Sequence, residues 1–320
     1  MSERSSPASS SRIMLLDVSR ALALIAMAVY HFGWDLEFFG YLAPGVTGHG
    51  AWRLFARTIA STFLVLVGLS LVLAHRRGVR WPAFWKREAQ IVASALTITV
   101  ATFFFTPDAF VFFGILHQIA LASLIGLIFL KTPWPLTAAA GAIAIALPWL
   151  YGTPILNPRW LAWTGLAEHP PLSTDLVPVF PWTGVVLLGL ATGQLLSNRA
   201  LWDRLRGMNA LLAPARPLAL VGRHALLFYL LHQPILIALV WIFAQIAPPN
   251  PIDVFRDQCQ ASCIPMRDEA FCRRYCACAQ ENLVSQGLMD SLVSGTPTQD
   301  ETDRVHAMAA QCTAEVEQAE

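Results

Sequence analysis

The sequence predicts an all-α, polytopic membrane protein: a bundle of transmembrane helices followed by a small, disulfide-rich helical tail. Hydrophobic residues make up 55% of its 320 residues and charged residues only 13%. The charged share is about half of that in a soluble domain. The mean hydropathy is +0.51. Five of the six cysteines lie between Cys259 and Cys278, and the apolar body has none.

Seven apolar segments approach the length of about 20 residues that an α-helix needs to cross a bilayer. The last of them is long enough to tilt or to bend around Pro234. We therefore expect about seven spans, at residues 13–32, 58–74, 88–106, 110–130, 135–151, 178–196 and 219–247.

Charge divides the chain into two regions. Residues 1–250 hold 17 Lys and Arg against 9 Asp and Glu, a net charge of +8, whereas residues 251–320 hold 5 against 12, a net charge of −7. This division predicts a disordered cytoplasmic N-terminus at residues 1–12, a transmembrane domain at residues 13–250 and an acidic, cysteine-rich tail at residues 251–320. Membrane lipids are the expected surroundings, and no nucleic-acid partner is expected.

The basic residues predict the orientation, because short cytoplasmic loops are enriched in Lys and Arg. One set of alternate loops holds only Arg53, Arg57 and Arg159. The other set is therefore cytoplasmic, and seven spans that start inside place the tail outside. An even number of cysteines suits an oxidising compartment there. The cytoplasmic set comprises Arg4, Arg12, Arg76, Arg77, Arg80, Lys86, Arg87, Lys131, Arg199, Arg204, Arg206 and Arg216.

The N-terminus also imitates a secretory signal peptide. A basic start and an apolar run are followed by the sequence AMA at residues 26–28, which resembles a cleavage site. Asp17 and Arg20 lie inside the apolar run and argue against cleavage. We expect the segment to remain as the first span.

The first span carries four ionisable groups, Asp17, Arg20, His31 and Asp35. At 100° per residue they fall within about 60° of one another around the helix. A charge that faces lipid costs a few kcal/mol at least, so this stripe should face the protein interior or a wet cavity. Alternatively, the two pairs lie at opposite interfaces and reach water there. Arg20 and His31 are separated by roughly 16 Å along the axis, about the reach of an extended pantetheine arm.

Polar side chains also interrupt two later spans. An unpaired polar group is costly in lipid, so His117, Gln118 and His232 are expected to face the bundle. There they either make interhelical hydrogen bonds or line a path for a substrate. Tyr229 lies about one turn before His232 and is placed to orient it.

His49 lies in the first outer loop, in the sequence GHG. The flanking glycines allow the backbone to approach a ligand closely, although an ordinary exposed loop histidine is the alternative. A metal site on His31, Asp35 and His49 is compatible with the ligand types, but no closely spaced ligand motif supports it. We expect no metal. The sequence also lacks GxSxG, P-loop and dinucleotide fingerprints.

Several stretches of the body follow one another in the order of a known family. They are LDVSRALALIAMAVYHFGWDLEFFG, HGAWRLFARTIASTFLVLVGLSLVLAH, GILHQIALASLIG (114–126), FPWTGVVLLGLATG (180–193) and LVGRHALLFYLLHQPIL (220–236). Together they cover most of residues 13–240. The set resembles the heparan-alpha-glucosaminide N-acetyltransferase catalytic-domain family, particularly its short bacterial members. That family is related to the membrane acyltransferases that modify extracytoplasmic glycans.

The resemblance implies transfer of an acetyl group from cytoplasmic acetyl-CoA to a sugar on the other side of the membrane. In the lysosomal enzyme the acceptor is a terminal glucosamine amine. The proposed catalytic residue there is a His followed by a small residue and a Trp. The matching stretch here is HGAW, which gives His49. The chain departs from the family at two positions: an Arg-Gly pair is Arg20-Ala21 here, and an Asn at the end of the first helix is His31.

We therefore expect an acetyltransferase of the bacterial inner membrane, which uses acetyl-CoA as donor substrate and holds no tightly bound cofactor. The expected acceptor is an amine or hydroxyl of an extracytoplasmic glycan or lipid-linked sugar. His49 should act as base or transient acetyl carrier, positioned by His31 and Asp35. The donor is expected at Arg20, Arg76, Arg77 and Arg223, and the substrate path at His117, Gln118, Tyr229 and His232.

A competing class stays open. It is a membrane transporter, or a non-catalytic scaffold of the cell envelope, that uses the same buried His, Arg and Asp for proton relay or packing. A homo-oligomer also stays open for either class.

The tail pattern is Cx3C, eight residues, Cx3CxC and one distant cysteine. The stretch MRDEAFCRRYCACAQENLVSQGL predicts a helix, and a second helix is expected around residues 299–319. Three disulfides that staple a periplasmic helical hairpin are the main expectation, with fifteen connectivities open. A zinc knuckle is the alternative, but it would require a reduced, cytoplasmic tail. The cysteines are Cys259, Cys263, Cys272, Cys276, Cys278 and Cys312.

Overall fold

The computed structural model describes residues 12–76, 78–293 and 295–318. Within these ranges the regular elements are helices, and one isolated bridge joins Thr153 to Ala167. The predicted all-α class is confirmed. The prediction of a disordered segment at residues 1–12 lies almost entirely outside the described residues.

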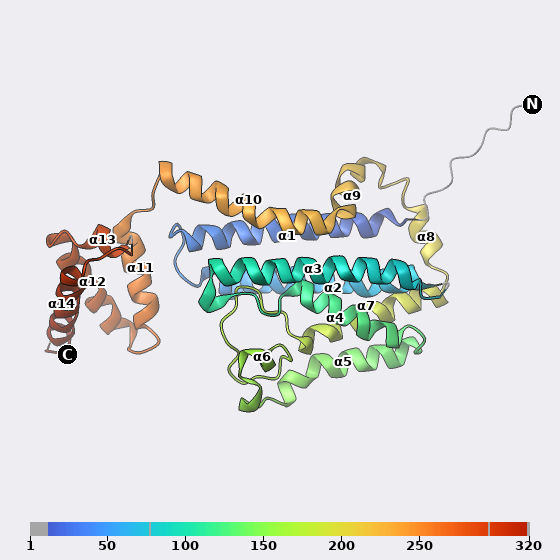
Figure 1. The fold of residues 1–320 in the computed structure, drawn as a ribbon, viewed down its shortest axis with the longest axis horizontal. Helices are drawn as coiled ribbons and strands as arrows, with labels where there is room; N and C mark the ends of the chain where they lie inside the picture. Colours follow the sequence, from blue (N-terminus) through green and yellow to red (C-terminus); the bar gives the residue numbers. More distant parts are fainter. Residues whose placement is uncertain (1–11, 77, 294, 319–320) are drawn as a thin grey trace, which may run out of the picture. The chain divides into compact units, whose positions relative to one another are not determined.

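Seven apolar helices correspond to the seven predicted segments (Figure 1). Five of them are long and apolar enough to cross a membrane, whereas α4 and α5 have only 15 and 17 residues. The count of seven spans and the orientation stay predictions. The apolar helices are α1 (Met14–Phe38), α2 (Gly50–His75), α3 (Trp81–Phe105), α4 (Ile115–Phe129), α5 (Trp134–Leu150), α7 (Val179–Asn198) and α10 (Ala225–Ile246).

Shorter and more polar helices complete the chain. Short helices connect the apolar ones, and the tail folds into helices of its own. They are α6 (Arg159–Ala162), α8 (Trp202–Gly207), α9 (Arg216–Arg223), α11 (Pro251–Cys263), α12 (Glu269–Ser285), α13 (Met289–Val293) and α14 (Gln299–Gln318). Single 3₁₀ turns lie at Val46–Gly48, Pro107–Ala109, Pro154–Leu156 and Ala213–Ala215.

The described chain divides into two compact units. The first comprises Met1–Met27 and Arg57–Leu231, as far as the structure describes these ranges, and the second comprises Ala28–Ala56 and His232–Glu320, with the same restriction. The division therefore falls within α1, α2 and α10. The predicted domain limits at residues 13–250 and 251–320 stay a prediction.

Within the first unit, glycines bring α7 close to two other helices. A Cβ atom on Gly184 of α7 would lie 2.5 Å from the carbonyl oxygen of Gly141 in α5. A Cβ atom on Gly189 of α7 would lie 2.4 Å from the carbonyl oxygen of Val65 in α2. Small residues at such contacts allow helix backbones to approach, as is common in membrane bundles.

Helix α4 begins five residues later than the start predicted at residue 110. Residues 110–114 form no helix, and hydrogen bonds join them to α3 instead. Thr99 Oγ1 donates a hydrogen bond to the Val111 carbonyl oxygen at 2.7 Å, and Val111 N donates to Thr102 Oγ1 at 3.0 Å. The loop before α7 pairs with the same segment, since Val177 N donates to the Phe113 carbonyl oxygen at 3.0 Å. These hydrogen bonds satisfy backbone N–H and C=O groups that would be bonded within α4 if the helix began at residue 110.

Within the second unit, three disulfides join the tail helices, as predicted. The pairs are Cys259–Cys276, Cys263–Cys272 and Cys278–Cys312. Since all six cysteines are paired, the alternative of a zinc knuckle is wrong for this state.

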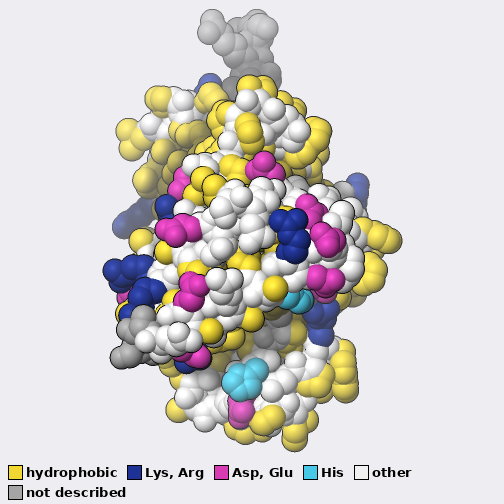
Figure 2. All heavy atoms as spheres, turned by 90° about the vertical axis from the view of Figure 1, so that its left-hand side faces the viewer, with side chains coloured by type: hydrophobic (Ala, Val, Ile, Leu, Met, Phe, Trp, Pro, Cys, Tyr) yellow, Lys and Arg dark blue, Asp and Glu magenta, His cyan; other side chains and the backbone are white. Residues whose placement is uncertain are grey.

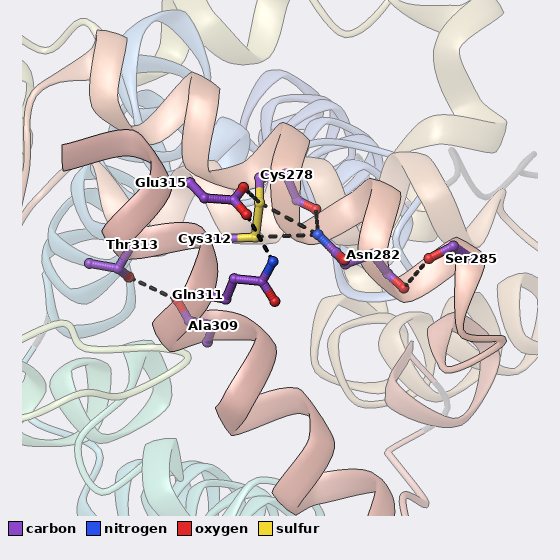
Figure 3. Close-up of a disulfide and its surroundings, with 8 residues drawn as sticks. All are labelled: Cys278, Asn282, Ser285, Ala309, Gln311, Cys312, Thr313 and Glu315. Atoms are coloured by element: carbon purple, nitrogen blue, oxygen red, sulfur yellow. Dashed lines mark hydrogen bonds between the residues drawn. A yellow bond between two sulfur atoms is a disulfide. The ribbon is translucent and has the colours of Figure 1, made fainter. Parts of the chain in front are cut away.

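The third disulfide joins α12 to α14. Beside it, Asn282 Nδ2 donates a hydrogen bond to the Cys278 carbonyl oxygen at 3.0 Å (Figure 3). Cys272, Cys276 and Cys312 have no exposed surface. Figure 2 shows one face of the tail, on which acidic and basic side chains are mixed with hydrophobic ones.

Candidate active site

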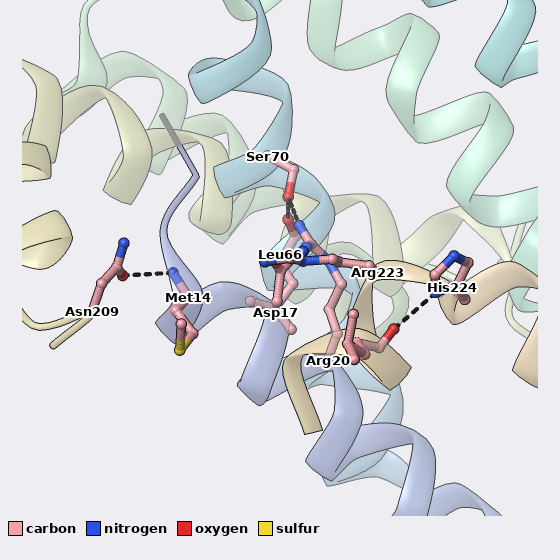
Figure 4. A network of polar contacts seen from close by, with 9 residues as sticks. Met14, Asp17, Arg20, Leu66, Ser70, Asn209, Arg223 and His224 are labelled. Atoms are coloured by element: carbon pink, nitrogen blue, oxygen red, sulfur yellow. Dashed lines mark hydrogen bonds and ion pairs between the residues drawn. The ribbon is translucent and has the colours of Figure 1, made fainter. Parts of the chain in front are cut away.

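The first unit contains a basic cluster beside the first turns of α1 (Figure 4). Arg20 Nη1 donates a hydrogen bond to Asp17 Oδ1 at 2.8 Å, and Arg20 Nη2 donates another to the Ser70 hydroxyl of α2. Arg223, the last residue of α9, lies with its Nε 3.6 Å from Asp17 Oδ2. The buried carboxylate of Asp17 therefore gathers two guanidinium groups from different helices.

This arrangement depends on close contact between α9 and α1. A Cβ atom on Gly222 would lie 1.8 Å from the carbonyl oxygen of Asp17, so no other residue fits there unless a backbone moves. The start of α1 is anchored as well. Met14 N donates to Asn209 Oδ1 at 2.9 Å, and Asn209 Nδ2 donates to the Arg12 carbonyl oxygen at 3.0 Å.

A cavity of ≈ 330 Å³ opens beside this cluster, within the usual size range of small-molecule sites. Four arginines and one carboxylate line it, and this excess of positive charge favours an anion. The guanidinium group matches the geometry of phosphate oxygens. The lining residues are Arg12, Asp17, Arg20, Leu24, Phe63, Leu66, Val67, Ser70, Arg87, Gln90, Ile91, Ile115, Leu116, Ile119, Gly222, Arg223, Ala225, Leu226 and Tyr229.

The cavity contains some of the residues predicted to hold the donor. Arg20 and Arg223 line it, and so does Tyr229, which was assigned to the substrate path. Arg76 is exposed and is not among the lining residues. Arg77 lies outside the described residues.

Two further lining arginines, Arg12 and Arg87, were assigned from the sequence to the cytoplasmic set of basic residues but were not among the four residues expected to hold the donor. Arg87 lies three and four residues before Gln90 and Ile91, which share its helix face and also line the cavity. The sequence shows that these three residues share one helix face. It does not show that this face of α3 lines the cavity.

A second polar cluster lies within the second unit, where α10 meets the end of α1. Gln233 Nε2 donates a hydrogen bond to Asp35 Oδ1 at 2.6 Å, and Asp35 is fully buried. The rings of His31 and His232 lie edge to face, with centroids 5.0 Å apart. The contacts of Asp35 and His31 in this cluster therefore come from α10. Gln233 is the residue of this cluster that was not predicted from the sequence. Its only signal there was that it is a polar side chain within an apolar run.

His49 lies in the loop between α1 and α2. Its Nδ1 is 2.7 Å from the Gly45 carbonyl oxygen, which can only accept a hydrogen bond, so Nδ1 is the donor. In the neutral ring this leaves the Nε2 lone pair available. His49 is exposed. Within the described part of the second unit, no hydrogen bond joins His49 to His31 or Asp35.

His117 and Gln118, assigned to the substrate path, both make contacts within the bundle. His117 Nδ1 accepts a hydrogen bond from Gly114 N at 3.2 Å, and its ring stacks on Phe113. Gln118 is fully buried, and its Nε2 donates to Thr183 Oγ1 of α7 at 2.8 Å. Neither residue is among those that line the cavity. Their role in a substrate path stays a prediction.

Asp175, in the loop before α7, was not predicted from the sequence. Its Oδ2 accepts a hydrogen bond from Ile115 N at 3.0 Å and thereby caps α4. A Cβ atom on Gly114 would lie 2.4 Å from this oxygen, so Gly114 makes room for the carboxylate. Burial raises the pKa of Asp175 to about 6, while the hydrogen bond from Ile115 lowers it. Asp175 also interacts electrostatically with Tyr229.

No group of three or more His, Cys, Asp and Glu side chains suited to a metal ion occurs among the described residues. The alternative of a metal on His31, Asp35 and His49 gains no support there.

The fold and the basic cavity define a class, a polytopic helical membrane protein with an arginine-lined site. A family model described as "Heparan-alpha-glucosaminide N-acetyltransferase, catalytic" matches residues 12–234. Because the match covers well over half of the chain, the protein belongs to this family, as the sequence predicted. This membership indicates a membrane acyltransferase. Neither the comparison with curated proteins nor the comparison with solved structures gives a match.

Proposed function

We propose that the protein transfers an acetyl group from cytoplasmic acetyl-CoA to an amine or hydroxyl of a glycan or lipid-linked sugar on the other side of a bacterial inner membrane. Membership of the family supports the reaction class. The observation that supports acetyl-CoA as the donor is the cavity, which four arginines and one carboxylate line. Acetyl-CoA is a substrate here, since its acetyl group is consumed.

The arginines would bind the phosphate groups of the donor. Arg20 and Arg223 have side chains 25% and 35% exposed, so they retain access to a ligand while they contact Asp17. Arg12 and Arg87 are also exposed and would add positive charge to the site. The apolar remainder of the wall suits the uncharged part of the donor.

The chemical step requires a base for the acceptor. We assign it to His49, whose Nε2 would take the proton as the acceptor nitrogen or oxygen bonds to the acetyl carbon. The bond between that carbon and the sulfur of coenzyme A breaks, and the thiolate leaves with the electron pair. A transient acetyl group on Nε2 is the two-step version of the same transfer. His31 and Asp35 would position His49 on the side of the membrane where the acceptor binds.

The orientation follows from the distribution of basic residues. The number of spans is odd in two cases: if all seven apolar helices cross the membrane, and if α4 and α5 do not cross and five helices remain. The tail would therefore lie on the side opposite the N-terminus in either case. We place the tail in the periplasm, where its three disulfides are stable.

Binding of acetyl-CoA to the purified full-length protein tests the proposal. Titration calorimetry should give saturable binding that weakens at least tenfold in Arg20→Ala and less in Arg20→Lys. Arg76→Ala removes an exposed cation outside the cavity and should bind as the wild type. The thermal unfolding midpoint of each variant reports whether it is folded. No saturable binding to the wild type, or equal binding by folded Arg20→Ala, contradicts the donor site and favours a transporter or scaffold.

A further inference from the structure

One carboxylate holds the loop that follows α1. Glu37 is half-buried in the last turns of this helix, and its Oε1 accepts a hydrogen bond from Gly45 N at 2.6 Å. Its Oε2 accepts from Thr47 N at 2.8 Å and from Thr47 Oγ1 at 2.6 Å. Thr47 is 3% exposed, so this contact is shielded from water. Hydrogen bonds to an ionised carboxylate are about twice as strong as neutral ones.

The same loop contacts His49. The Gly45 carbonyl oxygen accepts hydrogen bonds from His49 Nδ1 at 2.7 Å and from Gly48 N at 3.0 Å. Glu37 binds the backbone N–H groups of Gly45 and Thr47, which precede and follow this carbonyl group in the chain. The carboxylate therefore fixes the direction in which the carbonyl oxygen points. Gly45 has a φ of 83°, which glycine adopts without strain.

We propose that Glu37 is a positioning residue for His49: through the Gly45 carbonyl group it keeps the imidazole proton on Nδ1 and leaves Nε2 free to accept a proton. This inference rests on the proposed function, in which His49 is the base. Without a fixed acceptor at Nδ1, the neutral ring can carry its proton on either nitrogen. A ring protonated on Nε2 cannot take a proton from the acceptor at that atom.

Glu37 acts at a distance from the reacting atoms, and this predicts a specific kinetic effect. Loss of the carboxylate should lower kcat for acetyl transfer several-fold and leave the KM for acetyl-CoA unchanged, because the arginine-lined cavity is untouched. Reactivity of Nε2 should fall in parallel. Diethylpyrocarbonate acylates an unprotonated imidazole nitrogen, so the rate of acylation at His49 Nε2 reports this reactivity without an acceptor, provided that NMR distinguishes the Nε2 product from the Nδ1 product.

The direct test is the tautomer of His49 in the full-length protein labelled with ¹⁵N-histidine. In the wild type the Nδ1 resonance should be that of a protonated nitrogen and the Nε2 resonance that of a bare one, assigned by their loss in His49→Asn. Glu37→Gln should mix the two forms and slow the diethylpyrocarbonate reaction at Nε2 several-fold. Glu168→Gln, which changes an exposed carboxylate elsewhere, should change neither.

The outcomes separate the two proposals. If His49→Asn retains acetyl transfer in membrane vesicles, measured as release of the coenzyme A thiol, His49 is not the base and the proposed function is wrong in this respect. If His49 is required but folded Glu37→Gln keeps a single tautomer and the wild-type rate, only the role of Glu37 is overturned. A wild-type ring protonated on Nε2 also overturns it, and this measurement needs no Glu37 variant.

Discussion

Gln233 of α10 donates a hydrogen bond of 2.6 Å to Asp35 of α1, and Asp35 has no exposed surface. A buried carboxylate that loses its donor pays the cost of desolvation without compensation. The amide of Gln233 is thus a structural partner for the charged end of α1.

Replacing Gln233 by Leu should destabilise the protein. The change leaves Asp35 Oδ1 without this donor, and an unsatisfied buried polar group costs about 1–3 kcal/mol. Gln245→Leu is the matched control, because Gln245 lies on the same helix with an exposed side chain. Thermal unfolding in detergent should show a lower midpoint for Gln233→Leu only. Equal midpoints for the two variants would contradict a structural role of the bond.

Arg87→Ala should weaken binding of acetyl-CoA. A lost hydrogen bond to a charged group costs about 1.5–3 kcal/mol, or roughly ten- to a hundredfold in affinity. Lys86→Ala removes the same charge from the neighbouring residue, which does not line the cavity, and should change affinity little. Calorimetry at two salt concentrations measures both. A similar loss in both variants would indicate a general effect of charge instead of a contact in the cavity.

Asp175→Asn should stabilise the protein at pH 7.5 and have a smaller effect at pH 4.5. The folded pKa of Asp175, raised to about 6 by burial, exceeds its ordinary value of 3.8, so the folded state binds the proton more tightly. Stability from this group is present at low pH and is lost as the pH rises through about 6. Asparagine imitates the protonated form and still accepts from Ile115 N. Removal of the ionisable group should therefore stabilise the protein by up to about 3 kcal/mol at pH 7.5.

Unfolding midpoints at the two pH values test this sign. Asp108→Asn changes an exposed carboxylate and should leave the midpoint unchanged at both. If Asp175→Asn lowers the midpoint equally at both pH values, the hydrogen-bond geometry of the carboxylate matters and its ionisation does not.

Gly184→Ala should disturb the contact between α7 and α5. The new Cβ would lie 2.5 Å from a backbone oxygen, which a side-chain movement cannot relieve. Overpacking of this kind costs about 1–3 kcal/mol. At Gly207 nothing lies within 4 Å of an added Cβ, so Gly207→Ala serves as the control. The melting temperature should fall for the first variant and stay unchanged for the second.

A membrane-impermeant maleimide should label the tail in intact spheroplasts, but only after reduction. All six cysteines form disulfides and the body has none, so any label reports the tail. Labelling without a reductant would contradict the disulfides. Labelling that requires lysis as well as reduction would place the tail in the cytoplasm.

Hydropathy was sufficient to predict the apolar helices, because a run of about 20 apolar residues has few alternatives to a spanning helix. It was wrong about the start of α4. Val111 and Phe113 are as apolar as their neighbours. Their non-helical backbone bonds to Thr99 and Thr102 of α3 and to Val177, which lies more than sixty residues later in the chain. Local sequence contains no signal for such contacts.

The candidate site shows the same limit. Helical periodicity placed Asp17, Arg20, His31 and Asp35 on one face of α1. It could not give their partners, because Ser70, Arg223 and Gln233 come from other helices. The cysteine pattern predicted three disulfides, but the choice among fifteen connectivities depends on which tail helices pack together.

The pairing of the segment before α4 with the loop before α7 has a consequence for assembly. Ala109 and Phe113 receive hydrogen bonds from Thr174 and Val177, more than sixty residues later in the chain. During synthesis these carbonyl groups must wait until α4, α5 and α6 have been made, and closing so long a loop is slow. The amides of Thr174 and Val177 should therefore gain protection from hydrogen exchange late, which makes them reporters of the completed bundle.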